Sequence, residues 1–276
     1  MRFRLVQFWL TLVIFVCFWG CANDPHRPAE PGGCVWEIAD PVEHEELMRS
    51  VSMLDSENWV LSGAMGTILR SEDGGETWEK VTPGSSWYCL GQTFVNPDTG
   101  LVVGDGGKIG RTFDGGKTWS GVPSNTSNPL KGAGFSSPST AFVVGSAGTL
   151  LKSEDCGSTW RRLTMETPTE LSEISFSDSL TGAVVGLGGE ALFTSDGGDT
   201  WTRTDSGTME HLKSVEAYND STFFACGYGG VLLKSVDRGV SWTTIQLETT
   251  DRISCLSVIK NWGFGFGRRQ RIPVVE

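Results

Sequence analysis

The sequence predicts an all-β fold assembled from one structural unit that recurs along most of the chain. The first observation is an eight-residue box, SEDGGETW at 71–78, which returns four more times at a constant step of 41 residues. The second is a glycine-rich stretch, LSGAMGTIL at 61–69, which returns in phase with the box. The third is that no helical period lies between these landmarks. Together they predict a β-propeller whose blades are four-stranded antiparallel sheets.

One unit, residues 171–204, shows how four strands arise. LSEISF at 171–176 alternates apolar and polar residues, which is the pattern of a half-buried strand. AVVG at 183–186 and EALFTS at 190–195 are short strands on either side of a glycine turn, and glycine tolerates the positive φ that such turns need. DTWTRT at 199–204 supplies a fourth strand after the DGG turn.

The repeated box resembles the Asp-box, or bacterial neuraminidase repeat, S/T-x-D-x-G-x-T/S-W. Its aspartate is suited to accept backbone N–H bonds within its own turn, and its glycine supplies a permissive backbone. Its tryptophan offers a large apolar surface for packing one blade on the next. We therefore expect a structural role for the box residues Asp73, Gly75, Trp78, Asp114, Gly116, Trp119, Asp155, Gly157, Trp160, Asp196, Gly198, Trp201, Asp237, Gly239 and Trp242.

The number of blades depends on the two ends of the repeat region. Five boxes define five blades, and residues 253–276 align with the first three strands of a sixth. CVWEI at 34–38, with Trp36 close to the register of the box tryptophan, supplies a fourth strand that would remove the open edges of the ring. We expect six blades, at about 44–81, 87–122, 130–163, 171–204, 212–245 and 253–276 plus 34–38, with five or seven as alternatives.

The N-terminal 33 residues differ in composition from the repeats. Residues 1–20 carry two arginines before an apolar run, which is typical of an export signal peptide. The run ends in Gly20 and Cys21 and resembles a bacterial lipoprotein signal, so Cys21 is the expected lipidation site and 21–33 a flexible tether. An uncleaved anchor and ordinary cleavage nearby are the alternatives. We expect an exported, lipid-anchored protein of the bacterial periplasm or cell surface; the pairing of its cysteines stays open.

Composition and spacing exclude several functions. A net charge of −11 argues against a nucleic-acid-binding protein. The three histidines are far apart and form no metal-binding spacing, and the chain has no phosphate-binding loop or GxSxG motif. We expect no metal and no cofactor.

A binding face is expected where the turns between second and third strands meet the links between blades. These turns and links are short, so the face should be rather flat. Its candidate contact residues are Trp87, Tyr88, Asp105, His211, Tyr228, Arg268 and Arg269, although each also suits a solvated rim position.

A sialidase is the enzymatic alternative. QRIPV at 270–274 resembles the F/Y-R-I-P motif of that family, which would make Arg271 a ligand of the substrate carboxylate. The match falls on an expected third strand, whereas the family places its motif at the start of the catalytic domain. We expect no catalytic residues, with glycan binding or cleavage as the rival function.

Residues 171–201 carry a resemblance to a further family. They match the unit L-x-x-I-x-F-x-D-x-x-x-G-x-x-V-G-x-x-G-x-I-L-x-S-x-D-G-G-x-T-W at Leu171, Ile174, Phe176, Asp178, Gly182, Val185, Gly186, Gly189, Leu192, Ser195 (one position out of register), Asp196 and Trp201. From about residue 44 to 276 the chain resembles the photosystem II stability/assembly factor family of exported propellers. The resemblance implies a non-enzymatic, membrane-tethered scaffold, expected to be a monomer, that binds a protein partner such as a membrane-protein subunit.

That family uses arginines on the propeller as a contact patch. The corresponding cations here share one blade position, and Phe193 interrupts the series. They are candidate partner-binding residues, although side chains at strand ends also simply extend toward solvent. The residues are Arg70, Arg111, Lys152 and Lys234.

Overall fold

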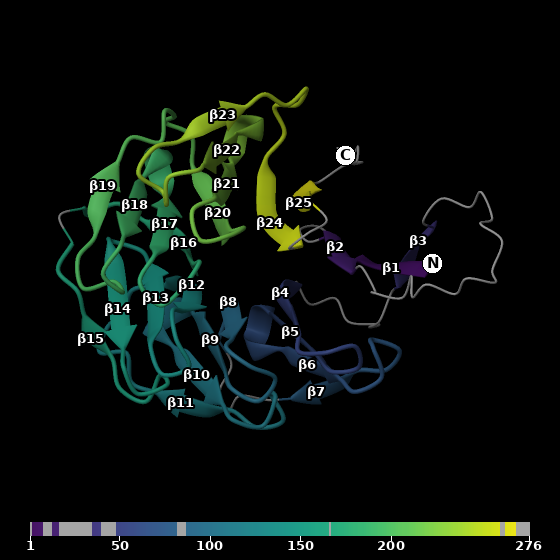
Figure 1. The fold of residues 1–276 in the computed structure, drawn as a ribbon. Helices are drawn as coiled ribbons and strands as arrows, with labels where there is room; N and C mark the ends of the chain where they lie inside the picture. The colour runs from purple at the N-terminus through teal and green to yellow at the C-terminus, as the bar shows by residue number, and fades with distance from the viewer. Residues whose placement is uncertain are drawn as a thin grey trace.

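The computed structural model describes residues 2–7, 13–16, 35–39, 48–81, 87–165, 167–259 and 263–268, with side chains described for 48–81, 87–165 and 167–257 (Figure 1). Five sheets have four antiparallel strands each, joined in chain order, which confirms the all-β propeller architecture. Their strands are β4 (Met48–Met53), β5 (Trp59–Gly63), β6 (Ile68–Ser71), β7 (Glu79–Val81), β8 (Cys89–Phe94), β9 (Gly100–Gly104), β10 (Ile109–Thr112), β11 (Ser120–Val122), β12 (Leu130–Phe135), β13 (Ala141–Gly145), β14 (Thr149–Ser153), β15 (Arg161–Arg162), β16 (Leu171–Phe176), β17 (Gly182–Gly186), β18 (Ala191–Thr194), β19 (Thr202–Thr204), β20 (Leu212–Ala217), β21 (Phe223–Gly227), β22 (Leu232–Ser235) and β23 (Thr243–Ile245).

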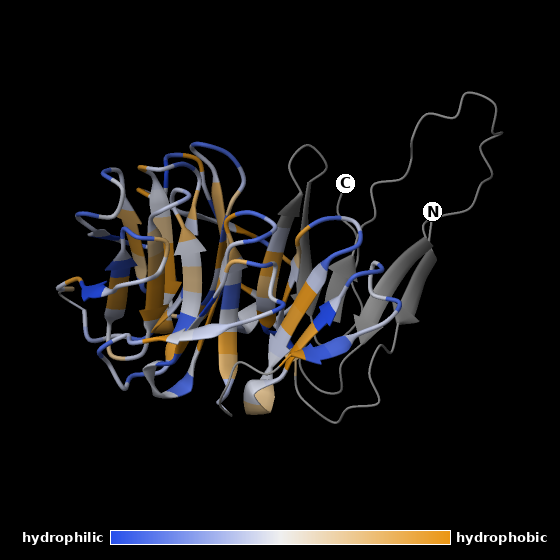
Figure 2. Cartoon of the chain, turned by 90° about the horizontal axis from the view of Figure 1, so that it is seen from below, coloured by the Kyte–Doolittle hydropathy of each residue, from blue (hydrophilic) through white to orange (hydrophobic). Residues whose placement is uncertain are grey.

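The blades follow one another in an arc, and the first strand of each lies nearest the common axis (Figure 1). We call β4, β8, β12, β16, β20 and β24 (Ile253–Ile259) the inner strands, because each lies beside the inner strand of the next blade. Seen from below, apolar residues concentrate in the strands and hydrophilic ones in the turns at their ends (Figure 2). The alternation seen in the sequence therefore corresponds to sheets packed face to face.

The glycine-rich stretch forms the turn between the second and third strands. In four blades this turn is a short 3-10 segment: η1 (Ala64–Gly66), η2 (Asp105–Gly107), η3 (Leu187–Gly189) and η4 (Tyr228–Gly230). Gly104 itself is extended, at φ −176°, but a Cβ there would overlap the carbonyl oxygen of Tyr88. Its glycine is needed for close approach, whereas Gly107, at φ 70°, is needed for its left-handed backbone.

The hydrophobic core lies between blades as well as within them. Trp160, in the box of the third blade, packs with Leu101 and Val103 of the second. Trp201 packs in the same way against Phe142, with ring centroids 6.2 Å apart at an interplanar angle of 76°. The third and fourth blades are thus stabilised by burying a box tryptophan against the preceding blade, whereas Trp78 of the first packs against Trp59 of its own blade.

The sixth blade and the N-terminus differ from expectation. β24 pairs with β25 (Gly263–Arg268) as a two-stranded sheet, and the expected third strand at 270–274 lies outside the described residues. β3 (Val35–Ala39), which we expected to close this blade, instead pairs in parallel with β1 (Arg2–Gln7), the partner of β2 (Val13–Val16).

This pairing corrects the expected closure of the ring. A strand with unpaired N–H and C=O groups joins an available edge, and in the full chain β1 offers one to β3. The number of blades stays a prediction. Within the described residues, no helix is long and apolar enough to cross a membrane.

Candidate functional site

The blades present two faces, which we name by their turns. The box face carries the five boxes and the turns between first and second strands, as shown by the bond from the amide of Gly115 to the carbonyl of Asp98, 2.9 Å. The turn face carries the turns after the second strands and the links that enter each inner strand. There the amides of Leu187 and Tyr228 donate to the carbonyls of Glu170 and His211, at 2.9 and 3.0 Å. Each inner strand is thereby fixed to its own blade.

The box corner is a closed set of hydrogen bonds. The Oδ1 atom of Asp155 accepts from the hydroxyl of Ser153 at 2.8 Å and from the amide of Thr159 at 2.8 Å. Its Oδ2 atom accepts from the Thr159 hydroxyl at 2.7 Å. The indole N–H of Trp160 donates to the carbonyl of Gly157 at 3.1 Å. Both oxygens of the carboxylate thus accept hydrogen bonds from the turn, which is the geometry of a structural corner.

The same bonds set the acidity of the box. Bonds from Thr77 lower the pKa of Asp73 to about 2, and bonds from Thr159 lower that of Asp155 to about 2. For Asp196 the pKa also falls to about 2, because bonds from Thr200 and Thr194 outweigh the opposing effect of burial. These aspartates are ionised at neutral pH, as hydrogen-bond acceptors require.

The cations at the shared blade position do not form an open patch. Arg70 is 8% exposed; its Nε donates to the carbonyl of Gly115 in the next box at 3.0 Å and its Nη2 to Asn58 at 2.7 Å. Lys152 lies 2.7 Å from Asp199 of the next box. Arg111 donates to Ser158 and covers the ring of Phe113.

We call these contacts latches, because each joins the third strand of one blade to the box of the next. At the position where the cation series is interrupted, the apolar Phe193 lies against Gly239 of the next box. Lys234 lies 5.8 Å from the centre of the Phe224 ring and makes no ion pair with any described residue. The geometry thus gives Arg70, Arg111 and Lys152 a role between blades, and their proposed contact with a partner stays untested.

The aromatic candidates lie on the turn face. Trp87 packs partly into the core between the first two blades, and Tyr88 is exposed beside the turn that Asp105 begins. Tyr228 is 37% exposed and stacks on His211, with ring centroids 5.2 Å apart. The side chain of Arg268, together with Arg269, Arg271 and Cys21, lies outside the part of the chain whose side chains are described.

His211 belongs to a polar network that sequence reasoning did not find. Its Nε2 lies 2.8 Å from the hydroxyl of Ser172 and 3.8 Å from Oε1 of Glu170. The other oxygen of Glu170 pairs with Lys131 at 2.8 Å. Burial, followed by the charge of Lys213, lowers the pKa of His211, so its imidazole is neutral at pH 7.

Two more cations complete this network. The guanidinium of Arg252 lies over the ring of Tyr228, 5.4 Å from its centre, and its Nη1 is 3.4 Å from the phenol oxygen. Lys213 lies on β20, and its pKa is lowered by burial and by the neighbouring Lys131. We call the set of Lys131, Glu170, Ser172, His211, Lys213, Tyr228 and Arg252 the axial cluster, because all of them lie on inner strands or at their entrances except Tyr228, which reaches His211 and Arg252 from η4.

Two partly buried carboxyl groups lie further along the same inner strands. Burial, reinforced by the charge of Glu216, raises the pKa of Glu173 to about 8. Burial raises the pKa of Glu216 to about 7. These groups hold protons in a range where the box aspartates have lost theirs.

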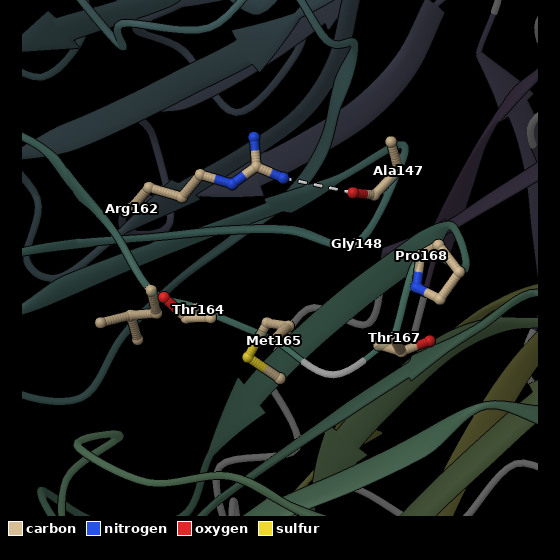
Figure 3. A pocket seen from close by; sticks show the side chains of 8 residues that line it. Ala147, Gly148, Arg162, Thr164, Met165, Thr167 and Pro168 are labelled. Carbon is tan, nitrogen blue, oxygen red and sulfur yellow. Dashed lines mark hydrogen bonds between the residues drawn. The ribbon is translucent and has the colours of Figure 1, made fainter.

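Two shallow hollows occupy equivalent positions in the second and third blades. One of about 550 Å³ is lined by Ala147, Arg162, Met165 and Pro168, and Arg162 donates to the carbonyl of Ala147 at 3.3 Å (Figure 3). The other, of about 680 Å³, occupies the equivalent seam of the second blade and includes Trp87. Because both form between a turn and a link of the repeat, they are features of the blade and not a single specialised site. Among the residues with described side chains, no cluster could hold a metal ion.

Comparison with known proteins identifies the family to which the chain belongs. The profile of the family described as photosynthesis system II assembly factor YCF48 matches residues 86–168 and 159–252. The two matches together cover more than half of the chain. The chain belongs to this family. The resemblance found in the repeats of the sequence is therefore confirmed, while no curated protein matches the chain.

Solved structures of propellers resemble this YCF48-family chain in fold. A structure of YCF48 bound to D1 peptide is 18% identical, with a TM-score of 0.56, and the match covers 83% of this chain and 92% of that one. The GH74 xyloglucanase from Xanthomonas campestris is 14% identical, with a TM-score of 0.63; the match covers 76% of this chain but 42% of the enzyme. The WD40 repeats of RRP9 are 8% identical, with a TM-score of 0.68, covering 80% and 72%. At these identities the likeness shows the fold alone.

Proposed function

We propose that this YCF48-family protein is a non-enzymatic scaffold that binds a segment of a protein partner on its turn face, next to the axial cluster. The observation that carries this proposal is the axial cluster, in which Lys131 and Lys213 lie near the carboxylate of Glu170 and Arg252 adds a third cation beside Lys213. The family consists of assembly factors, and a relative has been solved with a D1 peptide, which supports a protein as the ligand. The partner class is a membrane-protein subunit, as in the assembly of a photosystem.

The exposed residues around the cluster favour a protein partner. Leu187 is 46% exposed and Tyr228 37% exposed, and both lie in turns beside the inner strands. Exposed apolar and aromatic side chains around a charged centre are typical of protein-binding surfaces. Polar rim residues alone would not supply this apolar contact area.

Site-specific photo-crosslinking tests which face binds. A benzophenone amino acid replaces Tyr228 on the turn face or, as the matched control, Phe113 on the box face, which is 55% exposed. We expect membrane-protein adducts from the Tyr228 position and few from the Phe113 position. Adducts from Phe113 alone would place the partner on the box face, and the absence of protein adducts from both would contradict the scaffold function.

We also propose that the chain is exported and held at a membrane by a lipid on Cys21. The GC junction after the apolar run supports this proposal. Metabolic labelling with an alkyne fatty acid should mark the wild-type protein and leave Cys21→Ser unlabelled. Equal labelling of both proteins would assign the lipid elsewhere, and labelling of neither would argue against a lipid anchor.

Glycan hydrolysis is the second candidate function. Glu173 and Glu216, with pKa values raised to about 8 and 7, resemble the acid/base carboxyls that glycosidases need, and GH74 enzymes share the fold. Assays with xyloglucan and a fluorogenic sialoside test this alternative. Turnover that disappears in Glu173→Gln would favour the enzyme over the scaffold.

A further inference from the structure

The axial cluster has more positive than negative charge. Lys131 is paired with Glu170 at 2.8 Å, and Arg252 stacks on Tyr228. His211 is neutral at pH 7 because burial lowers its pKa. The cluster therefore contains three cations and one carboxylate, that of Glu170, in a protein whose overall net charge is −11.

Lys213 is the cation of the cluster whose charge has no direct partner among the described residues. Among the described residues, its ammonium has neither a hydrogen-bond acceptor nor an ion-pair partner. It is partly buried, and Lys131 and Arg252 both repel its charge. Removing a cation from water without a partner costs free energy, and nearby like charges increase that cost.

Glu173, on the inner strand next to β20, does not neutralise Lys213. Glu173 lies within electrostatic range of the ammonium, but its pKa of about 8 keeps it largely protonated at pH 7. Glu170 is the other acid near Lys213, and it is already paired with Lys131. An anion supplied by a ligand would meet an ammonium that the protein leaves without a counter-charge.

We propose that the axial cluster binds a carboxylate of the partner peptide, and that Lys213 is the residue that contacts it. This inference rests on the proposed scaffold function and names the chemistry of its ligand. Leu187, in η3 beside β20, and Tyr228 are exposed on either side of the strand that carries Lys213. An acidic residue or chain terminus flanked by apolar side chains matches this arrangement.

Fluorescence anisotropy with the full-length protein in detergent tests the inference. Three octapeptide pools, each labelled with an uncharged fluorophore, are built from alanine, leucine and phenylalanine: one with a free C-terminal carboxylate, one amidated, and one amidated with a single aspartate. Binding of the first pool alone assigns a chain terminus, and equal binding of the third assigns an acidic side chain. Indifference to the carboxylate overturns the inference.

Substitution identifies the residue. Lys213→Met should weaken binding of a carboxylate pool about tenfold or more, since a charge-assisted hydrogen bond is lost. Lys117→Met, the same change at an exposed position of the box face, should leave affinity within about twofold. Lys213→Arg should restore part of the affinity. Circular dichroism confirms that each variant is folded.

The two proposals fail in different ways. If Tyr228 crosslinks to a membrane protein while Lys213→Met binds every pool as the wild type does, the scaffold stands and the carboxylate contact is wrong. If neither crosslinks nor peptide binding appear, the scaffold function itself fails. If Lys213→Met and Lys117→Met weaken binding equally, the attraction is a general effect of net charge and the site is not at Lys213.

Discussion

The pKa values of the carboxyl groups on the box face and on the inner strands are shifted in opposite directions. Asp73, Asp155 and Asp196 have pKa values of about 2, because hydroxyl and amide groups donate to the ionised form. Glu173 and Glu216 have pKa values of about 8 and 7, because burial disfavours their charge. The box stabilises its carboxylates by hydrogen bonds, whereas the inner strands bury carboxyl groups that cost stability when they ionise. Such unfavourable placement is expected where function rather than folding sets the residue type.

Removing a box carboxylate should have the largest effect. Asp155→Ala breaks three hydrogen bonds, two from Thr159 and one from Ser153, which hold the turn of the box together. We expect a loss of about 2–3 kcal/mol in unfolding free energy, measured by urea denaturation. Asp220→Ala, an exposed aspartate in a turn of the same face, is the control and should change stability by less than about 0.5 kcal/mol. Equal losses would mean that the corner bonds contribute little.

Replacing an inner-strand carboxyl by an amide should stabilise the protein, in contrast to the loss of stability expected for the box. The pKa of Glu173 is raised in the folded state, so its proton favours folding fully below the unfolded value of 4.5, and this contribution is lost as pH rises toward 8. Glu173→Gln should therefore be more stable than the wild type by about 1–2 kcal/mol at pH 8 and equal to it at pH 4. Thermal unfolding at both pH values measures this difference.

The exposed Glu57→Gln is the matched control and should change stability by less than about 0.5 kcal/mol. A Glu173→Gln variant with the wild-type pH profile would show that this carboxyl is solvated. The box aspartates should show the opposite dependence on pH. Because the pKa of Asp155 is lowered in the folded state, its contribution to the free energy of unfolding should be lost as the pH falls from 3.8 through about 2.

Removing a latch between a third strand and the next box should cost less stability than removing a box carboxylate. Lys152→Met removes the ion pairs to Asp199 and Glu154, at 2.7 and 3.2 Å, from a position that is nearly buried. We expect a loss of about 1 kcal/mol that shrinks in high salt, because the two acids remain solvated. Lys234→Met removes the equivalent side chain where no described residue forms an ion pair with it, and should cost less. A larger loss for Lys234→Met would contradict the assignment of the latches.

The smallest effect concerns backbone strain within the boxes. The residue after the box aspartate has a positive φ in all five copies, and in two of them it is not glycine: Cys156 at 58° and Arg238 at 68°. Arg238→Gly should stabilise the protein by about 0.5–1 kcal/mol, less the entropy that glycine adds to the unfolded chain. Gly197→Ala, the reverse change at φ 74°, should destabilise it by a similar amount. Differential scanning calorimetry resolves both, and changes of the same sign would refute the explanation.

The box was predictable from the sequence because its chemistry is local. Asp155, Gly157 and Trp160 lie within six residues, and five copies reveal which positions matter. The fold class followed from the same repetition, since a unit of four short strands has few other ways to bury its apolar faces.

The axial cluster was not predictable in this way. Glu170, Lys213 and Arg252 come from three blades and share no motif, because they meet only when the inner strands converge. One signal was present in the sequence. Arg49, Lys131 and Lys213 occupy the same repeat position near the start of the inner strand, in every second repeat. The arginines of the third strands were easier to notice and lie in latches. The pairing of β3 with β1 was also missed, because a strand does not specify its partner from one sequence alone.

The latches have a consequence for how the blades are ordered. Each junction uses different chemistry: a guanidinium to the carbonyl of Gly115, a guanidinium to Ser158, an ammonium to Asp199, and an aromatic ring against Gly239. Blades that are alike in their internal sheets are therefore not interchangeable. Exchanging the fourth and fifth would set Lys152 against Val240, so that Lys152 would lose its ion pair with Asp199 and keep only the one with Glu154 of its own blade. Because the contacts differ from one junction to the next, the latches favour one order of the blades around the propeller.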